Sequence, residues 1–94
     1  MTYTSSAVLT FYIPHAASLK DKRQVRRSLI EKTRHKYNAS IAEVATQEVL
    51  QTLTIGVAVV SGEVAHRQNA LDEIIRFMEA HTNAELMNIE MEGA

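Results

Sequence analysis

The sequence predicts an α+β domain of the ferredoxin-like type, a β-α-β-β-α-β plait with two helices on one face of a four-stranded antiparallel sheet. Three observations predict it. Strand-like and helix-like periodicities alternate in that order along the chain. The 94 residues form one domain, 1–94, because domains typically run from about 50 to 250 residues. Right-handed crossovers then place both helices on the same face, with the first and third strands central and the other two at the edges.

The first strand and the first helix have clear boundaries. Residues 6–13 alternate with period two and are rich in β-favouring side chains, and Pro14 ends the strand because it cannot donate to a ladder. Ser18 followed by Asp21 has the spacing of a capping box, which predicts a helix beginning at residue 19. This helix should run to about Tyr37.

The remaining elements follow the same two periodicities. Residues 39–44 form a short strand at an edge, and residues 51–60 form a central strand because both of its faces are apolar. Ser61 is the predicted cap of a second helix that ends near His81. A last strand, 86–92, alternates apolar with polar side chains.

The composition excludes several classes of protein. There are no cysteines, so neither a disulfide nor thiolate chemistry is available. No basic leader and no apolar run of about 18 residues occur, so we expect a cytoplasmic protein that does not span a membrane. The four histidines lack metal-ligand spacing, and no phosphate-loop or nucleophile motif occurs. We therefore expect no metal, no cofactor and no enzymatic activity; Glu43, a catalytic acid in principle, is more simply a charge that guards an edge strand.

The charge is divided unevenly along the chain. Residues 19–37 carry a net charge of +6 and residues 38–94 carry −7, although the whole chain carries only −1. A polarised surface of this kind favours an anionic partner. At 100° per residue, four cations form a narrow stripe along the helix: Lys20, Arg23, Arg27 and Arg34. The predicted nucleic-acid contacts are these four residues and Lys22. The alternative is a basic helix face that is merely solvated.

The sheet face without helices offers a second surface. It is predicted to carry Val8, Thr10, Tyr12, Thr54 and Ala58, a small and moderately apolar set. An RNA-recognition motif would stack bases on several aromatic side chains here, and only Tyr12 could serve. We expect a homodimer through this face or through an edge strand, and the alternative is a solvated face. Arg26 falls on the apolar side of the helix, where either its stem packs and its guanidinium reaches the rim, or it meets a partner's carboxylate.

Three segments carry a family resemblance that covers almost the whole chain. Residues 13–23 (IPHAASLKDKR), 38–44 (NASIAEV) and 56–61 (GVAVVS) resemble the YlxP-like family of small bacterial proteins. The resemblance implies a ferredoxin-like fold, an unknown function and an RNA- or ribosome-associated role, since members often occur beside ribosome-maturation and translation genes. The signature positions it implies are Ser18, Leu19, Lys20, Lys22, Arg23 and Glu43. His15 departs from the usual glycine, and Arg26 departs from the usual aliphatic residue.

These observations lead to two functional hypotheses. The first is a small accessory protein that binds RNA or a ribosomal or translation assembly through its basic first helix, as a homodimer. The second is a protein–protein interaction module, either a homodimer or a binder of an acidic partner, with no role in binding nucleic acid. Neither hypothesis involves a small-molecule substrate.

Overall fold

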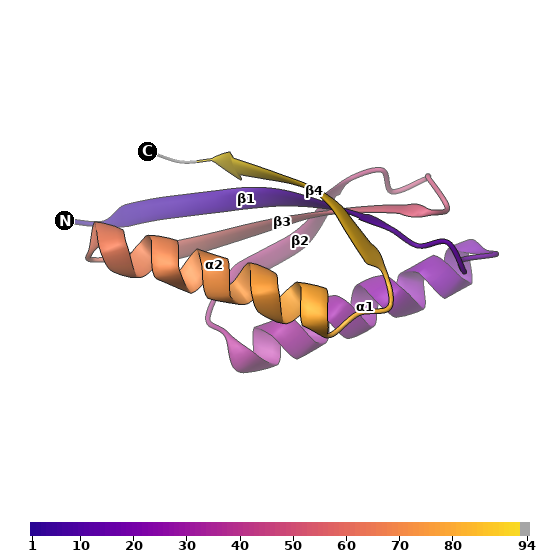
Figure 1. Ribbon diagram of the computed structural model, residues 1–94, viewed down its shortest axis with the longest axis horizontal. Coiled ribbons are helices and arrows are strands. Elements are labelled where there is room, and N and C mark those ends of the chain that lie inside the picture. The colour runs from indigo at the N-terminus through magenta and orange to yellow at the C-terminus, as the bar shows by residue number, and fades with distance from the viewer. Residues whose placement is uncertain (93–94) are drawn as a thin grey trace.

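The computed structural model describes residues 1–92, apart from the side chains at positions 64 and 67, and has the predicted order of elements. A four-stranded sheet forms one layer and two helices form the other (Figure 1). The ferredoxin-like plait is therefore confirmed. The elements are β1 (Tyr3–Tyr12), α1 (Leu19–Lys36), β2 (Ser40–Ala45), β3 (Thr52–Ser61), α2 (Val64–Ala80) and β4 (Glu85–Glu92).

The strands lie in the order β2-β3-β1-β4, and every neighbouring pair is antiparallel. The prediction that the first and third strands are central is confirmed. Leu9 lies opposite Ile55 on one side and opposite Ile89 on the other, which sets the register of the three strands. Bulges interrupt two ladders: the register shifts between Thr10 and Phe11 where β1 meets β4, and between Glu43 and Ala45 in β2.

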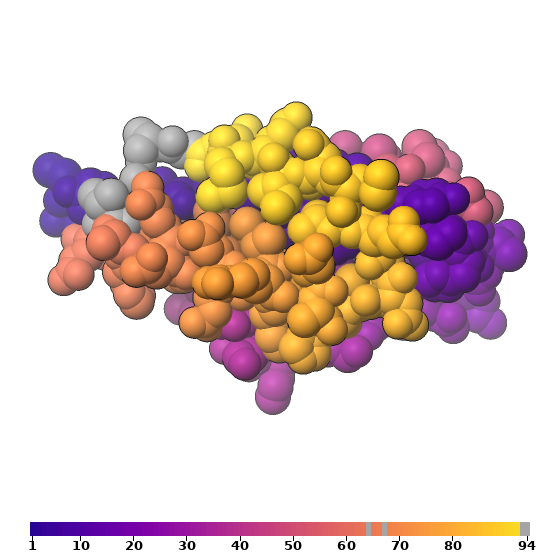
Figure 2. Space-filling model, viewed as in Figure 1, coloured from indigo at the N-terminus to yellow at the C-terminus, as the bar shows by residue number. Residues whose placement is uncertain are grey.

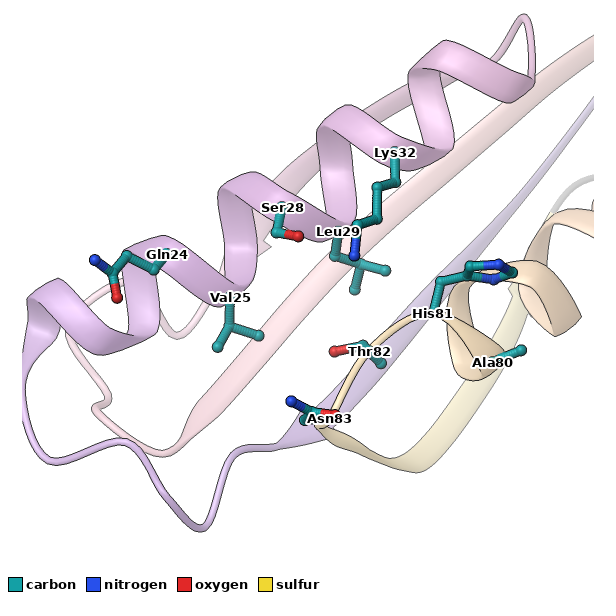
Figure 3. A pocket seen from close by; sticks show the side chains of 9 residues that line it. All are labelled: Gln24, Val25, Ser28, Leu29, Lys32, Ala80, His81, Thr82 and Asn83. Atoms are coloured by element: carbon teal, nitrogen blue, oxygen red, sulfur yellow. The ribbon is translucent and has the colours of Figure 1, made fainter.

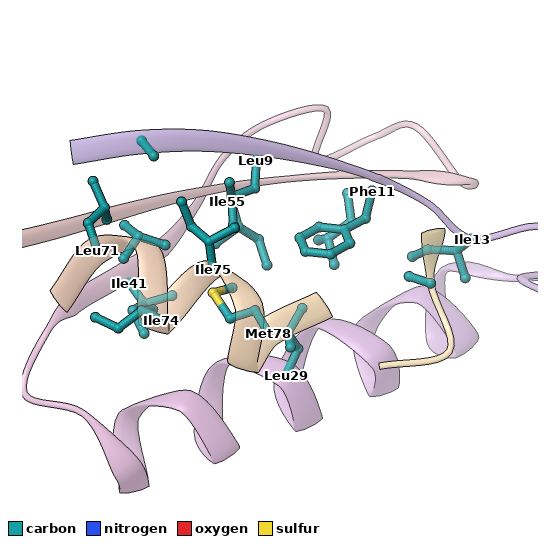
Figure 4. Close-up of a cluster of buried hydrophobic side chains, with 14 of the residues drawn as sticks. Leu9, Phe11, Ile13, Leu29, Ile41, Ile55, Leu71, Ile74, Ile75 and Met78 are labelled. Atoms are coloured by element: carbon teal, nitrogen blue, oxygen red, sulfur yellow. The ribbon is translucent and has the colours of Figure 1, made fainter. Parts of the chain in front are cut away.

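The core lies between the sheet and the two helices (Figure 4). Alternate residues of β1 and β3 point into it, as the period-two pattern predicts. Each fully buried Leu, Ile or Phe side chain contributes about 1.5–3 kcal/mol relative to an exposed one. The largest fully buried apolar side chains are Phe11, Leu9, Ile13, Leu29, Ile41, Leu53, Ile55, Leu71, Ile74, Met78 and Val57.

The two helices begin in different ways. The Asp21 N–H donates to Ser18 Oγ at 3.1 Å, and the Ala17 N–H donates to Asp21 Oδ2 at 2.9 Å, so the predicted cap of α1 is confirmed. The predicted cap of α2 is wrong. Ser61 is the last residue of β3, because that strand runs one residue further than expected, and Glu63 is the N-cap without a side-chain bond. Ser61 Oγ instead accepts from the Glu63 N–H at 3.1 Å.

Candidate functional site

The exposed cations of α1 form the main candidate site. We call Lys20, Arg23, Arg27 and Arg34 the basic stripe; all four residues are exposed. In the part of the chain that the structure describes, the only ion pairs join Glu43 to Lys22 and to Arg26. No carboxylate of the described residues therefore forms an ion pair with the stripe. Arg34 is held at one end of it, since its Nη2 donates to the Ile41 carbonyl of β2.

Lys22 does not belong to this surface, and its predicted role as a nucleic-acid contact is wrong. It is 1% exposed, and its Nζ lies 3.1 Å from Glu43 Oε2. The ammonium also donates to main-chain carbonyls of the β2–β3 connection, namely those of Thr46, Val49 (2.8 Å) and Gln47 (3.4 Å). Lys22 lies on the buried side of α1, where an ammonium needs a full set of partners. It cannot reach a phosphate outside the fold.

Glu43 joins the buried lysine to the surface of α1. Its side chain is 8% exposed, and Oε1 accepts from Arg26 Nη1 at 3.0 Å. The predicted simple guard of an edge strand is therefore wrong, because this carboxylate is buried in a charge cluster with Lys22 and Arg26. A partner's carboxylate for Arg26 is also wrong, since Glu43 of the same chain supplies it. The cluster of Glu43, Lys22 and Arg26 therefore has a net charge of +1. Its partly exposed cation, Arg26, lies one helical turn from Arg23.

Sequence reasoning missed a polar groove on the opposite flank of α1. It has a volume of about 390 Å³ and lies between α1 and the turn that follows α2 (Figure 3). Lys32 is the one lysine or arginine that lines the groove, and no carboxylate lines it. The His81 ring stacks on Phe77 with 4.0 Å between centroids, and its Nδ1 donates to the Phe77 carbonyl at 2.8 Å. The spacing of Phe77 and His81, one helical turn apart, was the sequence signal for this stacking.

The open face of the sheet has the small side chains that the sequence predicts, with one correction. Tyr12 is 37% exposed, and Val8, Thr10 and Ala58 are partly exposed. Thr54 is 6% exposed, because Thr46 lies over it with 2.8 Å between the two Oγ1 atoms. Thr54 therefore cannot contribute to an interface as predicted. For the other four residues, a role in dimerisation stays a prediction.

The described residues contain neither a metal-ligand cluster nor a membrane-spanning helix. Within residues 1–92, no group of three or more His, Cys, Asp or Glu side chains is arranged to hold a metal ion. No helix in the same part of the chain is long and apolar enough to cross a membrane.

Comparisons with known proteins identify a family whose function is unknown. The family described as "Protein of unknown function (DUF503)" matches residues 5–91. The chain is similar to the uncharacterized protein YlxP of Bacillus subtilis (strain 168), with 30% identity over 70 residues that cover 74% of this chain and 76% of that protein. Because the match extends over nearly the whole fold, this chain is a member of the DUF503 family, to which the YlxP resemblance had pointed.

Proposed function

We propose that this protein is a cytoplasmic, non-catalytic accessory protein that binds RNA, or an RNA-containing assembly of the translation machinery, through the basic stripe. One observation carries the proposal. Lys20, Arg23 and Arg27 are exposed, and no carboxylate of the described residues pairs with them. Like charges along one helix face cost a few tenths of a kcal/mol per pair, and an anion bound along the stripe offsets that cost.

The structural roles of the signature positions support this proposal. Ser18 caps α1, and Lys22 pairs with Glu43, so the fold itself accounts for these three residues. Lys20 and Arg23 have no hydrogen bond or ion pair with any side chain that the structure describes. Folding does not account for cations at these two positions, whereas contact with an anionic partner does.

The chemistry of the stripe suits phosphate groups rather than base edges. Arginine presents a planar fork that holds two phosphate oxygens at once, and two of the three unpaired cations are arginines. From Lys20 to Arg34 the stripe extends about 21 Å along the helix axis, at 1.5 Å per residue, which is long enough for several phosphates. Such contacts position a nucleic acid without reading its sequence. A folded RNA recognised by its shape is the partner that this surface fits best.

Anisotropy titration with a labelled RNA hairpin, at two salt concentrations, tests the proposal. Arg23→Glu combined with Arg27→Glu should abolish measurable binding, because it replaces two cations by two anions at the centre of the stripe. For the single variant Arg27→Glu, the matched control is Arg76→Glu, which makes the same charge change on the exposed surface of α2. We expect at least a tenfold loss for Arg27→Glu and less than a twofold loss for the control.

Two outcomes would contradict RNA binding through the stripe. Unchanged affinity of the doubly reversed protein would show that the stripe makes no contact. Equal losses for Arg27→Glu and Arg76→Glu would show that only the net charge matters. Circular dichroism of each variant confirms that the fold is intact.

A second candidate function is a protein–protein interaction module without a nucleic-acid role, either a homodimer or a binder of an acidic protein. It is favoured by large apolar side chains on the open sheet face, where Tyr12 is 37%, Val44 50% and Val60 67% exposed. Cross-linking in lysate followed by nuclease treatment separates the two candidates. Complexes that survive the nuclease favour this module, and complexes that dissolve favour RNA.

A further inference from the structure

The outer edge of β4 is apolar and unpaired. β4 is the last strand of the sheet, and within residues 1–92 it pairs with β1 alone. Its side chains are unusually exposed for their type: Met87 is 62%, Ile89 43% and Met91 55% exposed. Monomeric proteins normally protect such an edge, because its free N–H and C=O groups accept another strand.

The opposite edge of the sheet is protected. In β2 a bulge at Val44 shifts the register between Glu43 and Ala45, which breaks the regular spacing that another strand would need. Arg34 also occupies a main-chain acceptor of this edge through its bond to the Ile41 carbonyl. β4 has a register shift as well, at Met87, but its residues 88–92 offer a longer uninterrupted outer edge than β2 does.

An apolar groove runs beside the same strand. It has a volume of about 510 Å³ and is lined by Asp72, Ile75, Arg76, Ile89 and Met91. The groove exists because α2 packs over β1 and β3 and leaves β4 only partly covered. Figure 2 shows β4 in yellow lying alongside α2 in orange on this face of the molecule. Side chains placed beside β4 on its helix side would fill the groove.

We propose that a second copy of this chain binds at this edge, with its β4 antiparallel to the first, so that the two sheets become one sheet of eight strands. The sequence of β4 favours a second copy, because residues 88–90 are complementary to themselves in antiparallel pairing. With a two-fold axis normal to the sheet, the helix side of one copy continues as the helix side of the other. The axis must then pass between one residue of β4 and the same residue of the second copy. Only a few residues of β4 can occupy that position.

The axis at Ile89 gives the one favourable register. It places Ile89 against Ile89 of the second copy and Glu90 against Asn88, both within the uninterrupted residues 88–92, while Met91 extends towards the bulge at Met87. The Ile89 pair then lies on the helix side, because Ile89 is opposite the core residue Leu9 of β1, and each glutamate faces an amide. An axis at Glu90 would place two carboxylates directly opposite each other, and an axis at Asn88 would place Met91 against Glu85.

This dimer leaves the basic stripe accessible. α1 packs on β2 and α2, whereas β4 lies at the other edge of the sheet. The inference is independent of RNA binding, and it assigns the interface of the homodimer in the second candidate function to an edge strand rather than to the open face. Its failure would leave the RNA titrations unaffected, and their failure would leave the dimer unaffected.

Sedimentation velocity of the full chain tests the dimer. We expect the wild-type protein to sediment with the mass of a dimer, and Ile89→Lys with half that mass, because two ammonium groups then meet on the axis. Met91→Lys should act in the same way, as a check against a local folding defect at Ile89. The matched control is Val60→Lys, which adds the same charge on the open face and should leave the dimer intact. A monomeric wild-type protein, or dissociation by Val60→Lys alone, would overturn the proposal.

Disulfide trapping tests the register. The chain has no cysteine, so a single introduced cysteine can pair only with its copy. Directly opposite residues have Cα atoms roughly 4.5–5.5 Å apart, which is within the range of a disulfide. Ile89→Cys should therefore cross-link to itself, whereas Glu90→Cys should cross-link only when mixed with Asn88→Cys. Efficient self-linking by Glu90→Cys without linking by Ile89→Cys would overturn the register.

Discussion

The Lys22 ammonium lies 3.1 Å from the Glu43 carboxylate, and both groups are almost completely buried between α1 and β2. The remaining donors of the ammonium meet carbonyls of the β2–β3 connection, including that of Val49 at 2.8 Å. We call this set of contacts the Lys22 clamp. It ties the N-terminal half of α1, and with it Lys20 and Arg23, to a strand and a loop of the sheet.

Breaking the clamp on one side should destabilise the protein strongly. Glu43→Leu leaves a buried ammonium without its counter-charge, and such changes cost about 3–5 kcal/mol of unfolding free energy. Lys22→Met should cost a similar amount, because it leaves three carbonyls of the loop without this donor. The double variant should cost clearly less than the sum, since a matched apolar pair removes both charges. Urea unfolding of the four proteins measures the coupling.

Arg26→Met is the control for that cycle. Its side chain is 30% exposed, so its pair with Glu43 is partly hydrated and should contribute about 1 kcal/mol or less. Strict additivity of Lys22→Met and Glu43→Leu would contradict the clamp.

Gly56→Ala should destabilise the β2 edge, and a second substitution should relieve the cost. A Cβ at position 56 would lie 2.9 Å from Val44 Cγ1, which is too close. Val44 is 50% exposed and can rotate, so we expect a cost of about 1 kcal/mol, the size of an off-rotamer penalty. Gly56→Ala in a Val44→Ala background should cost less, as measured by thermal or urea unfolding. An equal cost in both backgrounds would show that the contact with Val44 is not responsible.

Stability at alkaline pH should depend on Tyr37. Burial, followed by a hydrogen bond to the Glu73 carboxylate and its charge, raises the pKa of Tyr37 above the usual value of about 10. The stabilisation is therefore fully present below about pH 10 and is lost as the pH rises, because the unfolded chain releases its phenolic proton first. Tyr37→Phe should make the unfolding free energy fall less steeply above about pH 10. Parallel curves for the two proteins would contradict this assignment.

The salt dependence of RNA binding should report how many residues of the stripe contact phosphates. On a duplex, each phosphate contact contributes about −0.9 to the slope of log affinity against log salt, so three or four contacts give about −2.7 to −3.6. Arg27→Gln should make the slope less steep by about 0.9. Arg76→Gln, the control on α2, should leave it unchanged. A slope near zero for the wild-type protein would contradict phosphate contacts.

Local patterns were sufficient to predict the architecture. The period-two alternation of β1 and β3 and the Ser18–Asp21 cap depend on neighbours in the sequence, and the structure agrees with them. The cap of α2 was predicted wrongly because Ser61 suits both the end of a strand and the start of a helix, and pairing with Tyr3 keeps it in β3. Strand pairing therefore decided between the two roles that the local sequence allows for Ser61, the end of a strand and the cap of a helix.

The candidate site was harder to predict because its contacts are non-local. Lys22 lies on the buried side of α1, yet its charge suggested a surface role. Its acceptors are main-chain carbonyls at residues 46–49, which no side-chain pattern reveals. In the same way Thr54 is covered by Thr46, a residue with a φ of 57° in the β2–β3 connection, and no residue type at that position signals the fold of the connection.

The clamp also has a consequence for the order of folding. The carbonyls that accept from Lys22 lie 24, 25 and 27 residues further along the chain, in the connection between β2 and β3. We expect the ammonium to stay hydrated until these two strands pair, so that its desolvation follows the transition state for folding. Substitutions at Lys22 should therefore accelerate unfolding and leave the refolding rate almost unchanged, a φ-value near zero in stopped-flow experiments. The lysine would then determine how long each molecule stays native, with little influence on how quickly it becomes so.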